Sequence, residues 1–485
     1  MTRSSPRHDV IIVGAGIAGM ACALALASRG VRPLVLETRK KLGGRATSFT
    51  DVRSAEVLDN CQHVALGCCT NFLDFLGSIG TASALTWYDD QYWFEPGGRM
   101  SIITANGLGR LSPAPGHYAA SLLRATFLTL GEKVILSRGI LDILSTDRSR
   151  WRDRTFELFL RTSGQTDRLI SRFWEPVIAS ACNLPCNRVA ASSALHVFQE
   201  GFLAHRRSAS IGIPSIPLVE LYRNLPTLLE SRGGEIRLGC SVDQLTTTSV
   251  TLSRTGETLH APAVISAVPF PSALQIIDPT IQAADARFAA MRTFGTSPIL
   301  GVHLRFDRPV LRTPHAVLVD QPTQWLFSAP GHTDGRAVHA VISAADAWLQ
   351  LSEEQVASQI LTDIRRCMPW AAQARLLSCR PVKEKLATIA PTPEMEAHRP
   401  AATAGPGSLI LAGDYTDTGW PSTMEGAVRS GRIAAAAFLG LSPESLLSPS
   451  LAPGLLTLAL GLRPPSDSTS PGYRGILPAQ PALAS

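Results

Sequence analysis

Residues 9–45, DVIIVGAGIAGMACALALASRGVRPLVLETRKKLGGR, decide the fold of this chain. Positions 10–13 form a continuous apolar run, which is typical of a strand buried on both faces of a parallel sheet. Gly14, Gly16 and Gly19 follow with G-x-G-x-x-G spacing. The first glycine permits a tight turn, the second admits a pyrophosphate, and the third lets helix and strand pack closely.

The continuation of this stretch predicts a dinucleotide site. A helix of small residues begins with Ile17 and Ala18, whose backbone we expect beside the cofactor, and a second buried strand, 31–36, leads to Glu37. A carboxylate at that position accepts both hydroxyls of an adenosine ribose and would repel a 2′-phosphate. The alternative is an ordinary βαβ unit whose glycines serve only packing.

The loop after Glu37 favours FAD over NAD. Leu42-Gly43-Gly44-Arg45 resembles the glycine doublet of the FAD-dependent amine oxidase and phytoene desaturase superfamily. Gly44 would let the loop approach the diphosphate, and the planar fork of Arg45 would neutralise its charge. A glycine turn with a solvated arginine is the alternative.

The composition excludes several other classes of protein. The chain has 485 residues and a net charge of +6, without zinc-finger spacing or a long basic run, so nucleic acid is not an expected partner. Nine cysteines at irregular spacings, without a credible export signal, predict reduced thiols in a cytoplasmic protein. Cys182 and Cys186 have no second pair, and no metal site is expected. No apolar run is long enough to span a bilayer.

A second informative stretch, LILAGDYTDTGWPSTMEGAVRSGRIAAAAFL, covers residues 409–439. It predicts a short strand, a loop, and a helix that begins with a capping box, Ser422-x-x-Glu425. The positive N-terminal end of such a helix suits an anionic reduced flavin. The family resemblance puts Gly413 and Asp414 on the ribityl-diphosphate side and the Met424 backbone at the pyrimidine edge. A plain surface helix is the alternative.

Two weaker signals complete the expected site. Residues 59–63, DNCQH, resemble the D-x-x-Q-H segment of squalene-associated members, although Asn60-Cys61 departs from their D-x-G-Q-H form. The resemblance puts His63 near the isoalloxazine, as the candidate catalytic group; a satisfied structural histidine is the alternative. Residues 235–268 resemble the block in which a residue near Val242 packs on adenine through its backbone.

Together with residues 385–400 and 413–426, these segments resemble the hydroxysqualene dehydroxylases of bacterial hopanoid biosynthesis. The resemblance implies reductive removal of an allylic hydroxyl from a C30 polyprenyl lipid, with FAD as cofactor and an electron donor that the sequence does not identify. Three alternatives stay open: a carotenoid-type desaturase, an amine oxidase, and an FAD-bearing protein without enzymatic activity. Gly419-Trp420-Pro421 departs from the usual amine oxidase loop.

The expected fold class is α/β. A discontinuous Rossmann-like FAD-binding domain would comprise 1–105, 214–285 and 396–441, and an inserted α+β substrate domain would comprise 106–213 and 286–395. The Pro/Ser-rich tail, 442–485, is expected to be disordered or to lie on a membrane. Arginines between Arg148 and Arg172 lie among large apolar residues. They indicate either a solvated face or peripheral contact with the inner face of the cell membrane.

Overall fold

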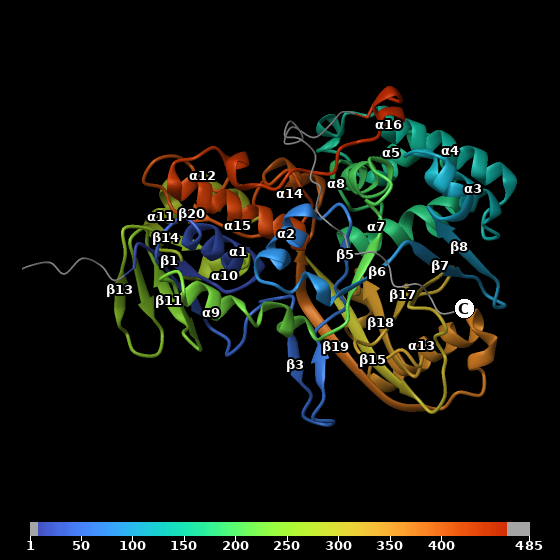
Figure 1. Ribbon diagram of the computed structural model, residues 1–485, viewed down its shortest axis with the longest axis horizontal. Coiled ribbons are helices and arrows are strands. Elements are labelled where there is room, and N and C mark those ends of the chain that lie inside the picture. The colour runs from blue at the N-terminus through green and yellow to red at the C-terminus, as the bar shows by residue number, and fades with distance from the viewer. Residues whose placement is uncertain (1–7, 463–485) are drawn as a thin grey trace, which may run out of the picture.

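The computed structural model describes residues 8–462 (Figure 1). Its first sheet is parallel and has the order β10-β2-β1-β14-β20. The strands are β1 (Val10–Val13), β2 (Pro33–Glu37), β10 (Glu235–Leu238), β14 (Val264–Ser266) and β20 (Ile410–Leu411). The three predicted segments of the cofactor domain therefore meet in one Rossmann-like sheet.

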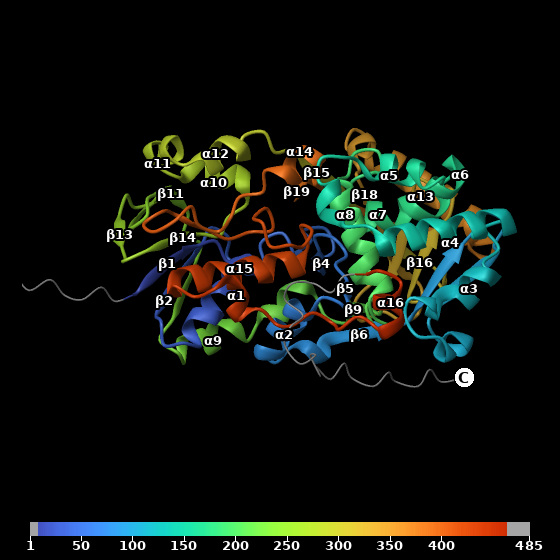
Figure 2. The same ribbon diagram turned by 90° about the horizontal axis from the view of Figure 1, so that it is seen from above.

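Two helices from opposite ends of the chain lie together on this sheet. α1 (Ile17–Ala27) packs against α15 (Met424–Leu439), as Figure 2 shows. A Cβ at Gly431 would lie 2.1 Å from the carbonyl oxygen of Ala18, so the two backbones are in contact. The small residues of α1 are what permit this approach, and they bring the glycine loop beside the start of α15.

The second large sheet is mixed and has the order β19-β15-β18-β17-β16-β7-β8. The strands are β7 (Asp90–Phe94), β8 (Met100–Thr104), β15 (Thr296–Phe306), β16 (His315–Leu318), β17 (Trp325–Ser328), β18 (Ala337–Ser343) and β19 (Leu376–Ile389). Residues 90–104 belong to the predicted cofactor segment 1–105, but the structure pairs them into this sheet, with Trp93 opposite Val317. Such non-local pairing leaves no local sign in the sequence.

Residues 106–213 are mainly helical. They form α3 (Ala119–Arg124), α4 (Leu130–Ser145), α5 (Phe156–Thr162), α6 (Asp167–Leu169), α7 (Glu175–Cys182) and α8 (Ala191–Phe198), and the π-helical turns η5 (Ile170–Trp174) and η6 (Gln199–Leu203). An aromatic core holds them together, in which Trp93 stacks on Phe127 with a centroid distance of 5.0 Å. Trp174 packs edge-on against Phe198 at 4.8 Å.

Smaller elements connect the two sheets. The short strands are β3 (Ser48–Thr50), β4 (Val57–Asp59), β5 (Ala65–Leu66), β6 (Leu85–Tyr88), β9 (Ile211–Pro214), β11 (Val242–Leu245), β12 (Ser249–Leu252) and β13 (Thr258–His260). The other α-helices are α2 (Thr70–Ser78), α9 (Leu225–Glu230), α10 (Phe270–Ile276), α11 (Pro279–Ala284), α12 (Ala286–Met291), α13 (Glu353–Cys367), α14 (Pro393–Ala397) and α16 (Leu455–Ala459).

The tail, for which we expect either disorder or a position on a membrane, is ordered at its beginning. Residues 443–446 form a 3₁₀ turn, η10, and α16 is anchored by its Thr457 hydroxyl, which donates to Leu203 O at 3.1 Å. Leu462 is buried in the aromatic core. Packing therefore orders the tail as far as residue 462; the remaining part, 463–485, lies outside the described residues. Across 8–462, no helix combines the length and the apolar character needed to cross a bilayer.

Candidate functional site

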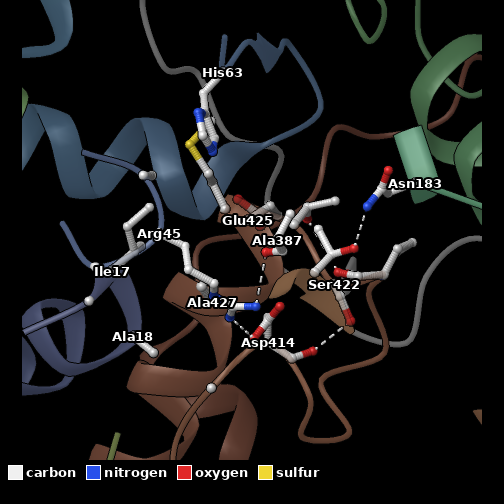
Figure 3. Close-up of a pocket in the computed structure, with 18 of the residues that line it drawn as sticks. Ile17, Ala18, Arg45, His63, Asn183, Ala387, Asp414, Ser422, Glu425 and Ala427 are labelled. Carbon is white, nitrogen blue, oxygen red and sulfur yellow. Dashed lines mark hydrogen bonds and ion pairs between the residues drawn. The ribbon is translucent and has the colours of Figure 1, made fainter. Parts of the chain in front are cut away.

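A cavity of about 660 Å³ lies between the two sheets and is lined by both (Figure 3). Twelve of the thirteen residues predicted for the site line it: Gly14, Gly16, Ile17, Ala18, Glu37, Gly44, Arg45, His63, Val242, Gly413, Asp414 and Met424. Gly19 does not. A Cβ on Gly19 would lie 2.0 Å from Gly14 O, so this glycine acts through helix–strand packing behind the cavity.

The glycine doublet lies directly against the glycine-rich loop. Gly16 and Gly43 form a parallel bridge, and a Cβ on Gly44, whose φ is +59°, would come within 3.0 Å of the Gly16 Cα. A Cβ on Gly16 would meet only Gly44 Cα, at 4.0 Å. Bare backbone is thus presented to the cavity where α1 begins, which fits a diphosphate.

Glu37 is held in place by backbone amides. Its Oε2 accepts the Ala15 N–H at 2.7 Å and its Oε1 accepts the Arg39 N–H at 2.8 Å. Each carboxylate oxygen has two lone pairs, so one acceptor site on each oxygen stays available. The contact with Ala15 ties the end of β2 to the glycine loop, so the loop and the predicted ribose acceptor are positioned together.

Arg45 and Asp414 form an ion pair in the cavity wall. The Arg45 guanidinium also donates to Ala387 O at 3.3 Å, and Figure 3 shows its side chain lying between these two partners. The positive charge predicted to face the diphosphate is therefore fixed by a carboxylate from the C-terminal segment. The pair joins the glycine doublet to the loop before α15.

The N-terminus of α15 is capped differently from the prediction. Thr423 is the N-cap residue, and its hydroxyl accepts the Gly426 N–H at 3.2 Å. Ser422 instead donates to Asp414 O at 3.0 Å. Cap geometry is set by which residue leaves the extended conformation, and the sequence pattern misplaced it by one position. The amides of Met424 and Glu425 have no intrahelical partners at this end.

Glu425, the other half of the predicted capping box, serves a different helix. Its fully buried carboxylate accepts the Asn71 and Phe72 backbone N–H groups, at 3.2 and 2.8 Å, and the Asn71 amide at 2.9 Å. These donors are the first turn of α2. Burial raises the pKa of Glu425, while Arg429 and the α2 donors oppose that rise. Glu425 therefore joins α15 to α2.

His63 lies in the cavity wall with its Nδ1 3.0 Å from Cys61 O. Burial lowers the pKa of His63, so the imidazole is neutral near pH 7. A carbonyl is only an acceptor, so Nδ1 carries the proton and Nε2 is an acceptor. In this state His63 can accept a hydrogen bond from a hydroxyl, but it has no proton at Nε2 to give.

The far end of the cavity was not predicted. It is lined by side chains from η6, the π-helical end of α8, and from α7, β7, β17 and β18, among them Gln91, Val177, Ala181, Phe202, Phe327 and Val341. His196 also lines it, with its ring 4.6 Å from that of Trp420. Burial holds the pKa of His196 well below its usual value. These residues are far apart in the chain, and only the aromatic content of 151–202 was a signal.

Two carboxylates of the cavity wall are already engaged. Glu200 pairs with Arg148 at 2.9 Å, and Glu425 is occupied by α2. Neither carboxylate is free to pair with a cationic substrate. Within residues 8–462, no cluster of His, Cys, Asp and Glu side chains could hold a metal ion.

Comparisons with known proteins agree with this geometry. The family model for flavin containing amine oxidoreductases matches residues 17–439. A hydroxysqualene dehydroxylase of Sinorhizobium fredii is 29% identical over 88% of this chain and 97% of its own length. A 15-cis-phytoene desaturase of Synechococcus elongatus is 23% identical over 90% of this chain and 96% of its own. A solved structure of putrescine oxidase shares the fold, with a TM-score of 0.67 at 17% identity, covering 89% of this chain and 99% of the oxidase.

Proposed function

The chain belongs to the flavin containing amine oxidoreductase family and is an FAD-dependent oxidoreductase; from this premise we propose that it converts hydroxysqualene to squalene. The observation that carries the proposal is the continuity of the cavity. A glycine-lined cradle for a dinucleotide passes without interruption into a chamber with largely apolar walls. A C30 alcohol fits such a chamber better than a small cationic amine does. The similarity to hydroxysqualene dehydroxylase over most of both chains supports the same reaction.

The reaction balances with a hydride and one proton. FAD, when bound and reduced, would supply the hydride, and a proton from solvent would let the hydroxyl leave as water, so that hydroxysqualene gives squalene. The C–O bond breaks and a C–H bond forms at the same carbon.

The protein residues position the substrate and limit water. Apolar walls from Val177, Phe327 and Val341 exclude water from the allylic carbon, whose positive charge water would trap. The neutral His63 holds the substrate hydroxyl as an acceptor at Nε2. A neutral His63 has no proton at Nε2 to give to a leaving hydroxyl, so we assign it the role of acceptor.

The deciding experiment is an anaerobic single turnover. Photoreduced protein is mixed with hydroxysqualene in detergent, and flavin absorbance and product mass are followed. We expect squalene in an amount equal to the flavin that becomes oxidised. His63→Ala should slow this step by about tenfold, which corresponds to one lost hydrogen bond.

A carotenoid-type desaturase is the second candidate, because a phytoene desaturase matches 90% of this chain. Its electrons would flow towards the flavin. If oxidised protein desaturates phytoene or dehydrosqualene while reduced protein leaves hydroxysqualene unchanged, the dehydroxylase assignment is wrong.

A further inference from the structure

The helical region carries an exposed apolar surface away from the cavity. On α4, Leu130, Val134 and Leu141 are 73%, 66% and 51% exposed. Their spacing of four and seven residues places them on one face of the helix. Single exposed leucines are normal on protein surfaces, but a contiguous row needs a partner.

α16 extends this row. Leu455 is 87% exposed and Leu456, Leu458 and Leu460 are each about 40% exposed. A Cβ on Gly461 would lie 3.3 Å from Ser145 Cα, so α16 reaches the C-terminal end of α4. Figure 2 shows α3, α4 and α16 at the same end of the molecule. We call the exposed faces of α4 and α16 the apolar face.

The charges beside the apolar face are mostly positive. Residues 106–145 carry Arg110, Arg124, Lys133 and Arg138, against Glu132 and Asp142. Glu132 is already neutralised by Arg168, and residues 451–462 carry no charge. Leucines between exposed basic residues match the composition of surfaces that lie in the interface of an anionic bilayer.

The arginines between 148 and 172 are different. Arg148 pairs with Glu200, Arg161 with Glu157 and Asp167, Arg168 with Glu132, and Arg172 with Asp320. Their charge is largely balanced by neighbouring carboxylates, so this stretch offers much less attraction to anionic lipid than the sequence indicated.

The apolar face lies next to the cavity wall, because α16 is hydrogen-bonded to the π-helical turn η6. α16 is bonded to η6 by the Thr457 hydroxyl, which donates to Leu203 O at 3.1 Å, and by the Gly454 N–H, which donates to Ala204 O at 2.9 Å. Gly201 and Phe202, in the same π-helical turn, line the far end of the cavity. A membrane on α16 would therefore lie beside the wall of the substrate chamber.

We propose that the apolar face of α4 and α16 docks on an anionic lipid bilayer and thereby places the η6 wall of the cavity at the membrane surface. The argument for lipid as the occupant combines exposed leucines, unpaired positive charge and, resting on the proposed function, a C30 substrate that dissolves in bilayers. Binding is reversible, because no segment of the face is long enough to cross the bilayer.

The test is sedimentation of the full-length FAD-loaded protein with vesicles of phosphatidylcholine, with and without phosphatidylglycerol. Wild-type protein should bind the anionic vesicles, and binding should weaken as salt is raised. Leu130→Gln/Val134→Gln/Leu141→Gln should reduce binding at least tenfold. Arg110→Gln/Arg124→Gln/Arg138→Gln should reduce it roughly a hundredfold, since each basic residue contributes about 1 kcal/mol near an anionic surface.

Matched controls carry the same kinds of change elsewhere. Val52→Gln/Leu238→Gln/Leu377→Gln removes exposed apolar side chains outside the apolar face, and Arg223→Gln/Arg254→Gln/Arg375→Gln removes three exposed positive charges outside it. Both should bind like wild type. Equal loss in the controls, or wild-type protein that stays in the supernatant with anionic vesicles, overturns the proposal.

A second copy of the chain is the competing occupant. If wild-type protein dimerises without lipid and the α4 variant is monomeric by analytical ultracentrifugation, the face is a dimer interface and the proposal is wrong. Vesicle binding is measured without substrate and the single turnover is measured in detergent. Failure of either proposal is therefore seen separately.

Discussion

The cofactor end of the cavity is lined mainly by backbone from a few short motifs, whereas the substrate end is lined by side chains from scattered elements. At the cofactor end, Gly14, Gly16 and Gly44 create space by lacking a Cβ, and positions within each motif are close in sequence. At the substrate end, Val177, Phe202 and Phe327 meet only because α7, η6 and β17 converge. Local backbone geometry therefore determines dinucleotide binding at the cofactor end, whereas tertiary packing determines which lipid fits at the substrate end.

Glu425 departs from this contrast, because it belongs to a local cofactor motif but its hydrogen-bond partners lie in the distant helix α2. Its substitution is therefore the sharpest test of the contrast. Glu425→Ala should cost about 3 kcal/mol of unfolding free energy, since it leaves the buried Asn71 and Phe72 amides without an acceptor. Glu425→Gln keeps one acceptor oxygen and should cost less. Urea unfolding of both variants measures the difference; a loss below 1 kcal/mol for Glu425→Ala would contradict the structural role.

Substitutions made separately at the cofactor end and at the substrate end test directly whether the two ends act independently. Gly16→Ala should weaken FAD binding by about a hundredfold, or 2.7 kcal/mol, because the new Cβ occupies the approach to the pyrophosphate. The folded apoprotein should be unaffected, since that Cβ would meet only Gly44 Cα at 4.0 Å.

Ala181→Phe is the matched variant at the substrate end. It should leave FAD binding unchanged and slow hydroxysqualene turnover at least tenfold, because the ring fills part of the substrate chamber. Isothermal titration with FAD and single-turnover kinetics measure the two effects. If either variant damages both functions equally, the ends are not independent.

Acid should lower the stability of the region outside the five-stranded sheet more than that of the sheet itself. The five-stranded sheet contains no histidine, whereas burial lowers the pKa of His117 and of His315, outside that sheet, to about 4. A histidine whose folded pKa is depressed takes up its proton only on unfolding, so its stabilising contribution is lost as pH falls below 6.5.

Each of these two histidines should lower the free energy of unfolding by about 2 kcal/mol between pH 7 and pH 5. Urea midpoints at the two pH values measure this loss. His315→Phe should remove the part of this acid sensitivity that His315 contributes, because phenylalanine does not titrate. The new ring should be tolerated, since His315 lies in an aromatic cluster with Tyr92, Trp325 and Phe327. Equal acid sensitivity in that variant and in wild type would refute the assignment.

The smallest effect concerns the start of α15. Thr423→Ala should cost about 1 kcal/mol because it removes the N-cap acceptor of Gly426. Ser422→Ala should cost about 0.5 kcal/mol, since it loses only a donor to Asp414 O. Thermal unfolding of the two variants ranks them, and the reverse order would restore the capping box predicted from the sequence.

Several parts of this protein could be derived from sequence alone. The G-x-G-x-x-G turn, the acidic end of β2, the glycine doublet and the strand before α15 each follow from local backbone requirements, because a missing Cβ or a buried apolar run has the same consequence in any context. Twelve of the predicted residues accordingly line one cavity. Roles within it, such as the contact of Val242 with adenine, stay predictions.

Only the tertiary structure decided the rest. It assigned residues 90–104 to the second sheet, sent the Glu425 carboxylate to α2, paired Arg45 with Asp414, and packed α16 on η6. It also made His63 neutral through burial. Each outcome depends on which distant groups become neighbours and how much water they exclude. Burial and partner choice are properties of the packed chain, so no local pattern could specify them.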